Sequence, residues 1–458
     1  MLKWYGTYCI HCRNRHHCRD GLLPLQEDQS PGIELLSGLL MLALGIAFGI
    51  NPSKPDNPTG SIFFDVIRLV EETFTKNFAR AGLMIMTIGG YVAFMNAIKA
   101  TDALVYLSMK PLRWFRKFPY LSAMITIPIG QLLFITTPSA SGLGLLLVAS
   151  FFPVLINLGV SRLTALSVIA AATIFDQGPG SANTALAAQL IGQTNDEYFI
   201  THQLPLVIPT TLVVMVLYYF SNRYFDRKDH GVEEKLPEVT RPEVPLFFAI
   251  LPVLPLATLV IFSPFVGLIG THIKINTTIA MIFSLFVSLI AVAFCNRDFN
   301  KTFALFSTFW KGMGNVFASV VTLIVAAEVF SKGLISLGFI DSLVNYSSNA
   351  GLTGIGISVI FAIVVFGAAV LMGSGNAAFF SFGPLLPLVA TRIGLPAFAL
   401  VLPLQLSASM GRAVSPISGI IVAIAGVGGV SPMDLAKRNV IPLTGGFLFL
   451  LAYHFITL

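Results

Sequence analysis

The sequence contains little charge. Only 11% of its 458 residues are Asp, Glu, Lys or Arg, whereas a soluble globular chain carries roughly 25%. Hydrophobic residues make up 55% of the chain, and the mean hydropathy is +0.81. Long apolar segments with so little charge exclude an ordinary soluble domain and indicate a polytopic protein whose main partner is the lipid bilayer. The net charge of +6 does not indicate a nucleic-acid partner, because basic residues of membrane proteins gather in cytoplasmic loops.

Cysteine is also scarce. Three of the four cysteines lie in the first 18 residues, so no disulfide framework is predicted. Cys9 and Cys12, followed by His16 or Cys18, have part of the spacing of a zinc site, but nothing further along the chain completes it. We therefore interpret residues 1–31 as a polar N-terminal extension, either disordered or produced by a start-site artefact, and predict no metal site.

The sequence lacks the motifs of catalysis. It has no P-loop, no zinc-protease motif and no glycine motif of a dinucleotide site. Four of its histidines, His202, His230, His272 and His454, are scattered singly along the chain. These absences argue against a primary pump and against a membrane enzyme. No cofactor is predicted beyond H⁺ or Na⁺ as a coupling ion.

The apolar segments predict an all-α polytopic membrane protein with about 10–12 transmembrane helices. A first membrane half is expected over residues 32–224 and a second over 244–458, joined by a charged linker at 225–243. The basic loops at 99–117 and 222–243 both favour the cytoplasmic side. The sequence does not decide whether 141–158 crosses the membrane once or folds as a hairpin. The number of crossings between the two copies depends on whether the proline-rich segment 247–266 is transmembrane, so the sequence does not decide whether the two halves are parallel or inverted.

A stretch rich in small and polar residues occurs twice. In the second half, 371–377 (LMGSGNA) precedes an apolar run, and 411–419 (GRAVSPISG) interrupts the next helical stretch. In the first half, 136–142 (TTPSASG) and 176–183 (DQGPGSAN) have the same order. These pairs predict a two-fold internal repeat with two re-entrant hairpins and two broken helices. Such breaks are tolerated only where they face protein or a water-filled cavity, and paired breaks are typical of a transporter's substrate site.

The breaks predict an anion-binding site, because the N-terminus of a half-helix offers N–H groups and a positive dipole end. Short hydroxyl, amide and glycine residues beside these ends would let a ligand approach closely. Helix packing through small residues is the alternative explanation. The candidate substrate-binding residues are Ser139, Ser141, Gly142, Ser374, Gly375, Asn376, Arg412, Ser415 and Ser418.

Arg412 lies alone in the otherwise uncharged stretch 393–433. An intramembrane cation is costly and usually functional, and guanidinium matches a carboxylate with two hydrogen bonds. Alternatively, Arg412 reaches the membrane surface or pairs with Asp176 or Glu328. Asp176, Asn183 and Glu328 are candidates for a role in ion coupling, and Glu328 could instead belong to an ion pair.

The motifs at 372–377 and 411–419 resemble those of the anaerobic C4-dicarboxylate carriers of the DcuC family. Residues 140–144, Gln189, and the segment from Gly312 to Ala327 agree, so the resemblance covers roughly 35–458. It implies exchange or efflux of succinate and fumarate across a bacterial inner membrane by a multi-pass carrier, with a homodimer as one possible assembly. It also suggests kinship with the ion-transporter superfamily, whose folds use re-entrant hairpins and inverted repeats. A carrier of another carboxylate or of an amino acid and a passive anion channel are the alternatives.

Overall fold

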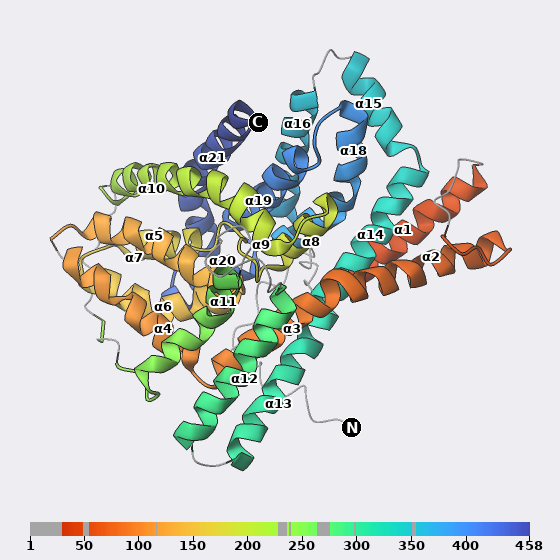
Figure 1. Ribbon diagram of the computed structural model, residues 1–458. Coiled ribbons are helices and arrows are strands. Elements are labelled where there is room, and N and C mark those ends of the chain that lie inside the picture. Colours follow the sequence, from red (N-terminus) through yellow and green to blue (C-terminus); the bar gives the residue numbers. More distant parts are fainter. Residues whose placement is uncertain are drawn as a thin grey trace, which may run out of the picture.

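The computed structural model describes residues 30–48, 55–115, 117–227, 236–237, 240–262, 275–296, 299–349 and 354–458. The predicted extension therefore lies almost entirely outside the described residues, and the predicted linker lies partly outside them. All regular elements of the described chain are helices (Figure 1). Those of the first half are α1 (Ser30–Ala47), α2 (Ile62–Asn77), α3 (Leu83–Ala97), α4 (Ala100–Ser108), α5 (Pro119–Thr136), α6 (Ala140–Asn157), α7 (Arg162–Ala171), α8 (Ala182–Ile191), α9 (Asn195–Tyr198) and α10 (Leu204–Asp226).

The second half follows the same order of elements. Its helices are α11 (Leu254–Phe262), α12 (Thr277–Asn296), α13 (Phe299–Val316), α14 (Thr322–Ser336), α15 (Phe339–Asn349), α16 (Gly354–Met372), α17 (Gly375–Phe382), α18 (Leu386–Ile393), α19 (Phe398–Val414), α20 (Gly419–Gly428) and α21 (Pro432–Thr457). The prediction of an all-α polytopic fold is confirmed.

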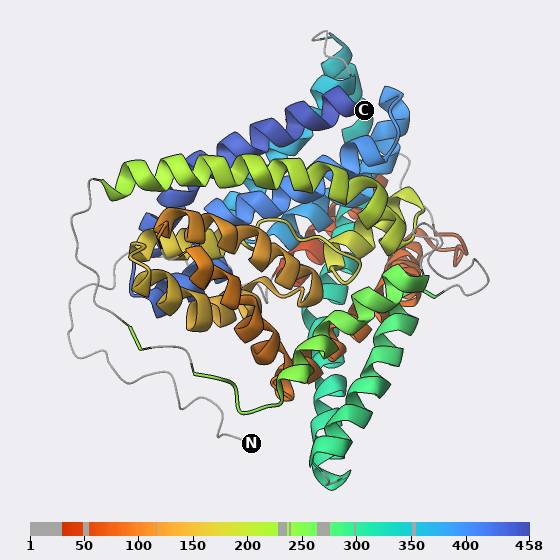
Figure 2. The same ribbon diagram turned by 60° about the vertical axis from the view of Figure 1, so that its left-hand side comes forward.

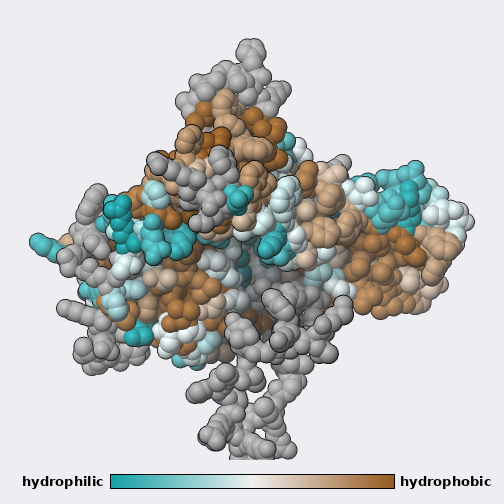
Figure 3. All heavy atoms as spheres, turned by 90° about the horizontal axis from the view of Figure 1, so that it is seen from below, coloured by the Kyte–Doolittle hydropathy of each residue, from teal (hydrophilic) through white to brown (hydrophobic). Residues whose placement is uncertain are grey.

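Eight helices of the described chain are long and apolar enough to cross a bilayer, and the bent pair α3–α4 adds a ninth. Three shorter apolar helices cover Pro31–Ala47, Arg162–Ala171 and Leu246–Phe262. A total of about 10–12 crossings therefore requires some of these shorter helices to span as well. Large apolar side chains such as Leu132 and Phe220 lie exposed on the outside, and Figure 3 shows broad hydrophobic areas on one face. Such a surface suits contact with lipid.

The two-fold repeat is visible in the backbone itself. A π-helical segment interrupts the long helix of each half, at Phe78–Gly82 and at Phe317–Val321, 239 positions apart. Left-handed backbone conformations recur at equivalent turns, where glycine is favoured because it has no Cβ. The equivalent pairs are Lys99 with Gly338, Gly159 with Gly394, and Gly192 with Gly429.

The two copies are inverted. Helices α2–α3 and α13–α14 are the long equivalents, and they pack against one another, α3 against α13 and α2 against α14. Residue numbers rise along one helix as they fall along the other, so the two run antiparallel. The contacting pairs are Thr73 with Lys332, Asn77 with Glu328, Gly89 with Val316, and Ala93 with Gly312. This arrangement decides whether the halves are parallel or inverted, which the sequence leaves open.

Each half contains a helical hairpin, but the first does not fold within 141–158. Residues 140–157 form the single helix α6, with Pro153 inside it. The chain reverses earlier, at 137–139, so that α5 and α6 pack together with Gly130 beside Leu147. In the second half α16 and α17–α18 are paired in the same way, and Gly354 at the start of α16 meets Ile393 at the end of α18.

Helix α19 lies at the centre of the molecule. Every residue from Ala399 to Val414 is buried. It packs against α8 of the first half as well as against α16, α17 and α21 of its own half. Helices α10 and α21, the last of each half, lie side by side across the molecule (Figure 2). The hairpins contact both broken helices, because α6 packs against α7 and α20, and α17 packs against α8 and α19.

Candidate functional site

A cavity of about 1010 Å³ lies where the hairpin tips and the helix breaks converge. Residues from both copies line it, which joins segments far apart in the sequence. Of the predicted site residues, those that line it are Ser139, Ser141, Asp176, Ser374, Asn376, Arg412 and Ser418. Gly142, Asn183, Gly375 and Ser415 lie directly behind this lining, whereas Glu328 lies elsewhere.

The first helix break is long and is shaped by its glycines and proline. Residues 172–181 separate α7 from α8, and Gly178 takes the left-handed conformation (φ 98°) immediately before Pro179. Ser181 then starts α8, because its Oγ accepts hydrogen bonds from the N–H groups of Asn183 and Thr184. The Ser181 hydroxyl is thus engaged in capping its own helix.

Side chains from other helices hold the first break in place. Gln405 of α19 donates from Nε2 to the carbonyl oxygen of Asp176 at 3.0 Å, and its Oε1 accepts from Tyr198 at 2.9 Å. Gln203 Oε1 accepts from the N–H of Gly178 at 3.1 Å. All these groups are buried, so the bonds satisfy backbone atoms that an interrupted helix would otherwise leave unpaired.

The second break is short. Helix α19 ends at Val414, and Ser415 adopts an extended conformation because the next residue is Pro416. Ser418 precedes α20, but its side chain makes no capping bond. The hydroxyls of Ser415 and Ser418 are fully buried and have no hydrogen-bond partner among the described residues. Ser418 also lines the cavity, so this hydroxyl lies beside the space that a ligand would occupy.

The hairpin tips present two further helix N-termini to the cavity. Ser139 precedes α6 and accepts from Gly142 N–H at 3.4 Å, while Ser374 precedes α17 and accepts from Ala377 N–H at 3.2 Å. The backbone angles of the two serines are nearly equal, as the repeat requires. Together with α8 and α20, four helices direct their positive dipole ends toward one cavity, which favours an anion there.

A hydrogen-bonded chain links the two copies beside the cavity. Asn183 Nδ2 donates to Asp176 Oδ2 at 3.0 Å and to Asn376 Oδ1 at 3.1 Å. Asn183 thereby connects the acid of the first break to the tip of the second hairpin. A change at Asp176 can consequently be transmitted to Asn376 through one side chain.

Arg412 is buried, with 8% of its surface exposed, and it lines the cavity. Its Nη2 donates to the carbonyl oxygen of Thr173 at 2.8 Å, and its charge also acts on Asp176. It does not extend to the membrane surface, and it does not pair with Glu328. The carboxylate of Glu328 instead contacts Lys332 at 3.0 Å and Asn77 at 2.6 Å.

Several cavity residues were not predicted. Glu34 of α1, Asn96 of α3 and Asn315 of α13 all line it, as does Ser319 in the π-helical segment that follows α13. Three of them come from ordinary α-helices and Ser319 from a π-helical segment, and no local sequence pattern distinguished them. Gln405 likewise sits in a continuous helix, and only the fold brings it to the break of the other copy.

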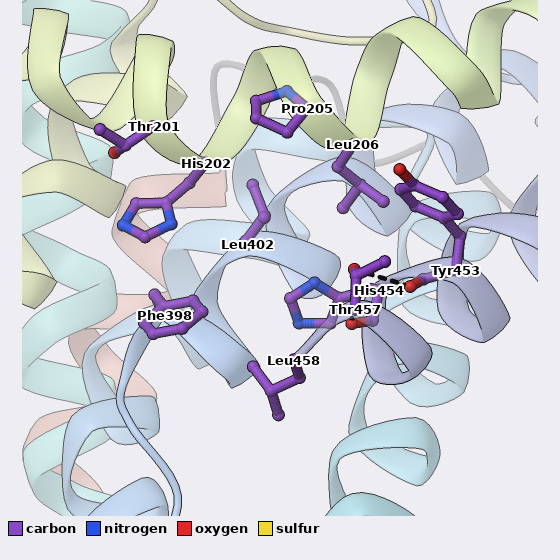
Figure 4. Close-up of a pocket in the computed structure, with 10 residues that line it drawn as sticks. All are labelled: Thr201, His202, Pro205, Leu206, Phe398, Leu402, Tyr453, His454, Thr457 and Leu458. Carbon is purple, nitrogen blue, oxygen red and sulfur yellow. Dashed lines mark hydrogen bonds between the residues drawn. The ribbon is translucent and has the colours of Figure 1, made fainter.

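A second cavity of about 260 Å³ lies between α10, α19 and α21 (Figure 4). His202 stacks on Phe398 there with 4.6 Å between ring centroids, and His454 contacts the carbonyl oxygen of Ala399 at 3.1 Å. None of the predicted site residues lines this cavity. The larger cavity is therefore the candidate functional site.

Comparison with known proteins agrees with this geometry. Residues 35–458 match the family model of the C4-dicarboxylate anaerobic carriers, DcuC. The chain belongs to the DcuC family. It is 33% identical to the anaerobic C4-dicarboxylate transporter DcuC of Escherichia coli K12 over 92% of this chain and 90% of that protein. A probable transporter of this family from Vibrio cholerae is also 33% identical, over 91% of each chain. These relatives are named as transporters, in agreement with the expectation of a non-enzymatic membrane protein.

Solved structures share the fold of this family member at low sequence identity. The YdaH transporter of Alcanivorax borkumensis aligns with a TM-score of 0.62 at 14% identity, over 93% of this chain and 98% of that one. MtrF of Neisseria gonorrhoeae aligns with a TM-score of 0.57 at 13% identity, over 93% and 94% of the two chains. The likeness extends over both halves and supports a transporter fold.

Proposed function

We propose that the chain is a secondary active transporter of C4-dicarboxylates in the bacterial inner membrane. The observation that carries the proposal is the convergence of four helix N-termini and one buried arginine on a single cavity. Each helix N-terminus is equivalent to roughly half a positive charge. A dianion with two carboxylates separated by a short carbon chain suits such a site. The names of the relatives supply the substrate class.

Different side chains would bind the two carboxylates of the substrate. Arg412 would hold one carboxylate through paired hydrogen bonds, helped by Ser418 and the N-terminus of α20. The hairpin tips would receive the other carboxylate, through Ser139 and Ser141 of the first copy and Ser374 and Asn376 of the second. Gly142 and Gly375 belong to the first turns of α6 and α17, and Ser415 supports the second break.

Coupling is assigned to the first copy. Asp176 lines the cavity and is bonded to Asn183, so H⁺ or Na⁺ arriving at this carboxylate would alter the charge beside the substrate. The same site would support exchange of succinate for fumarate or efflux of succinate. The chain would work without a further cofactor, and a homodimer is the proposed assembly.

Counterflow in proteoliposomes tests this function. Vesicles loaded with unlabelled succinate should take up labelled fumarate faster than empty vesicles, because exchange returns the carrier with substrate bound. A competition panel of dicarboxylates, monocarboxylates and amino acids identifies the preferred class, and collapsing the H⁺ and Na⁺ gradients separately identifies the coupling ion. An uptake rate that does not depend on internal substrate would indicate a passive channel. Competition by amino acids alone would indicate an amino-acid carrier.

A further inference from the structure

The N-terminus of α7 holds a buried carboxylate. Asp226, the last residue of α10, accepts hydrogen bonds from Ser161 Oγ at 2.9 Å and from Thr164 Oγ1 at 2.7 Å. Its carboxylate also contacts Arg438 Nη1 of α21 at 2.9 Å and accepts from the Tyr120 hydroxyl at 3.2 Å. Both charged side chains are buried. This place in the first copy is therefore a complete anion site, filled by a side chain of the protein itself.

The equivalent place in the second copy is open. The pairs of glycines at equivalent turns make Ala399, in the first turn of α19, the counterpart of Thr164. They also make Thr201 the counterpart of Arg438. Thr201 and the first residue of α19 line the cavity of about 260 Å³, and the carbonyl oxygen of Ala399 contacts His454 there at 3.1 Å. A cavity thus lies where the first copy holds a carboxylate.

Two histidines line this cavity (Figure 4). His454 is 5% exposed, and only its Nε2 atom has a hydrogen-bond partner among the described residues, the carbonyl oxygen of Ala399. His202 stacks on Phe398, but its ring nitrogens make no hydrogen bond within the described part of the chain. The two rings are close enough for their charges to interact. None of the described lining residues has an acidic side chain, so protonated rings would have no counter-charge in the cavity.

We infer that this cavity binds a small oxyanion of the carboxylate or phosphate class between His202 and His454. The ligand takes the place that the Asp226 carboxylate has in the first copy, and its binding does not depend on the proposed transport function. Protonated imidazole donates from both ring nitrogens, and the N-terminus of α19 adds its positive dipole end. The volume is below the roughly 300 Å³ of a pocket for a drug-sized molecule, so the cavity fits a free anion or a lipid headgroup but not a whole phospholipid.

The groups around the two rings predict how binding depends on pH. Imidazole gains its proton between about pH 8 and pH 5. On α9, the charge of Glu197 acts on His202, and the ring of Tyr198 lies 5.7 Å from it. On α21, Tyr453 also lines the cavity, whereas the lining residues of α10 and α19 do not titrate. The affinity for an anion should therefore rise as the pH falls across this range.

NMR of the histidine ring nitrogens tests the site in the parent protein. The full chain is studied in micelles of an uncharged detergent, and inorganic sulfate replaces chloride at constant ionic strength. Sulfate stays a dianion throughout this pH range, so a change in affinity reports on the protein. The signals of His202 and His454 should shift with sulfate, with an affinity that rises as the pH falls. The signals of the remaining histidines should not shift.

Single substitutions locate the ligand between the two rings. His454→Gln is followed at the His202 signal, and His202→Gln at the His454 signal. Each should weaken sulfate binding by at least about 10-fold, the equivalent of one hydrogen bond from a charged donor. Arg412→Ala is the control, because it removes the cation of the larger cavity and should change this affinity by less than about 2-fold. Equal affinity in both histidine variants and the parent protein would overturn the inference.

A second titration of the parent protein identifies the source of the anion. Anionic phospholipid is added to the micelles before sulfate. If the lipid shifts the two signals and prevents sulfate from binding, the ligand is a headgroup. If only sulfate shifts them, the ligand is a free anion. If neither shifts the two signals in parent protein that unfolds cooperatively on heating, the cavity binds no oxyanion and the inference is wrong.

Discussion

The two helix breaks at the cavity are equivalent by the repeat but differ in how their polar groups are used. In the first, Ser181 caps its own helix, and Gln203 and Gln405 hold the interrupted backbone. In the second, Ser418 makes no capping bond. The comparison teaches that the polar groups of the first break are engaged in hydrogen bonds around Asp176. In the second break, hydroxyl groups without a partner among the described residues and the N-terminus of α20 lie near Arg412. We therefore assign binding mainly to the second copy and coupling to the first.

The largest effect is expected at Arg412. Arg412→Ala should lower the rate of succinate exchange by at least about 30-fold, because truncating one partner of a buried charge pair costs roughly 2 kcal/mol or more. Arg412→Lys should keep part of the activity, since it retains the charge without the paired donors. Exchange is measured in proteoliposomes after confirming equal insertion. Equal rates for Arg412→Ala and parent protein would contradict the assignment of substrate binding to the second copy.

Asp176→Asn separates coupling from binding. The amide keeps an oxygen to accept from Asn183 but cannot carry a negative charge. We expect exchange without an ion gradient to persist, and the acceleration of uptake by that gradient to disappear. Uptake driven by imposed H⁺ and Na⁺ gradients is the measurement. A variant that still responds to the coupling gradient would place coupling outside the first break.

A smaller difference is expected between two serines at equivalent positions. Ser418→Ala should weaken succinate binding by about 2- to 12-fold, the equivalent of one hydrogen bond of roughly 0.5–1.5 kcal/mol, with little change in Tm. Ser181→Ala should lower the free energy of unfolding by about 0.5–2 kcal/mol, because it removes a helix cap. Binding isotherms and thermal unfolding of both variants check this. The reverse pattern would exchange the roles of the two breaks.

At the hairpin tips a difference in stability alone is expected. A Cβ at Gly375 would lie 2.8 Å from the carbonyl oxygen of Ala408, so Gly375→Ala should destabilise the protein by about 1–3 kcal/mol. A Cβ at Gly142 would lie 2.9 Å from Ser139 Oγ, a side-chain atom that can move by weakening its capping bond, so Gly142→Ala should destabilise the protein by less than Gly375→Ala. Thermal unfolding compares the two. Equal destabilisation would mean that both tips are equally confined.

Much of this architecture was predictable from local patterns. The apolar segments predict an all-α membrane fold, and the paired motifs predict the repeat with its two broken helices. The position of the first hairpin was not predictable, because Pro153 is tolerated inside α6 while the chain reverses at Pro138. The direction of the repeats required pairing between helices about 250 residues apart, such as Asn77 with Glu328. Only the folded structure supplies that information.

The candidate site was predictable to the extent that its residues are locally unusual. Serines and glycines inside apolar helices and the lone Arg412 mark it directly. Asn183 was predicted as a coupling residue, but its contact with Asn376 joins the two copies and has no sequence signal. Glu328 is just as unusual in sequence, yet it lies outside the cavity in an ion pair with Lys332. A charged residue inside an apolar segment therefore indicates a polar environment, but the sequence does not show whether that environment is the cavity or an ion pair elsewhere.

Ligand-induced stabilisation tests the central claim most directly. Thermal unfolding of purified protein is followed with succinate, using sodium chloride at equal ionic strength as the control. Succinate at 100 times its Kd should stabilise the parent protein by about 2.7 kcal/mol. We predict that Asp176→Asn retains a clear rise in Tm with succinate and that the rise in Arg412→Ala is about a third of the parent's or less. A rise in Arg412→Ala equal to that of the parent protein would contradict the assignment of substrate binding to the second copy.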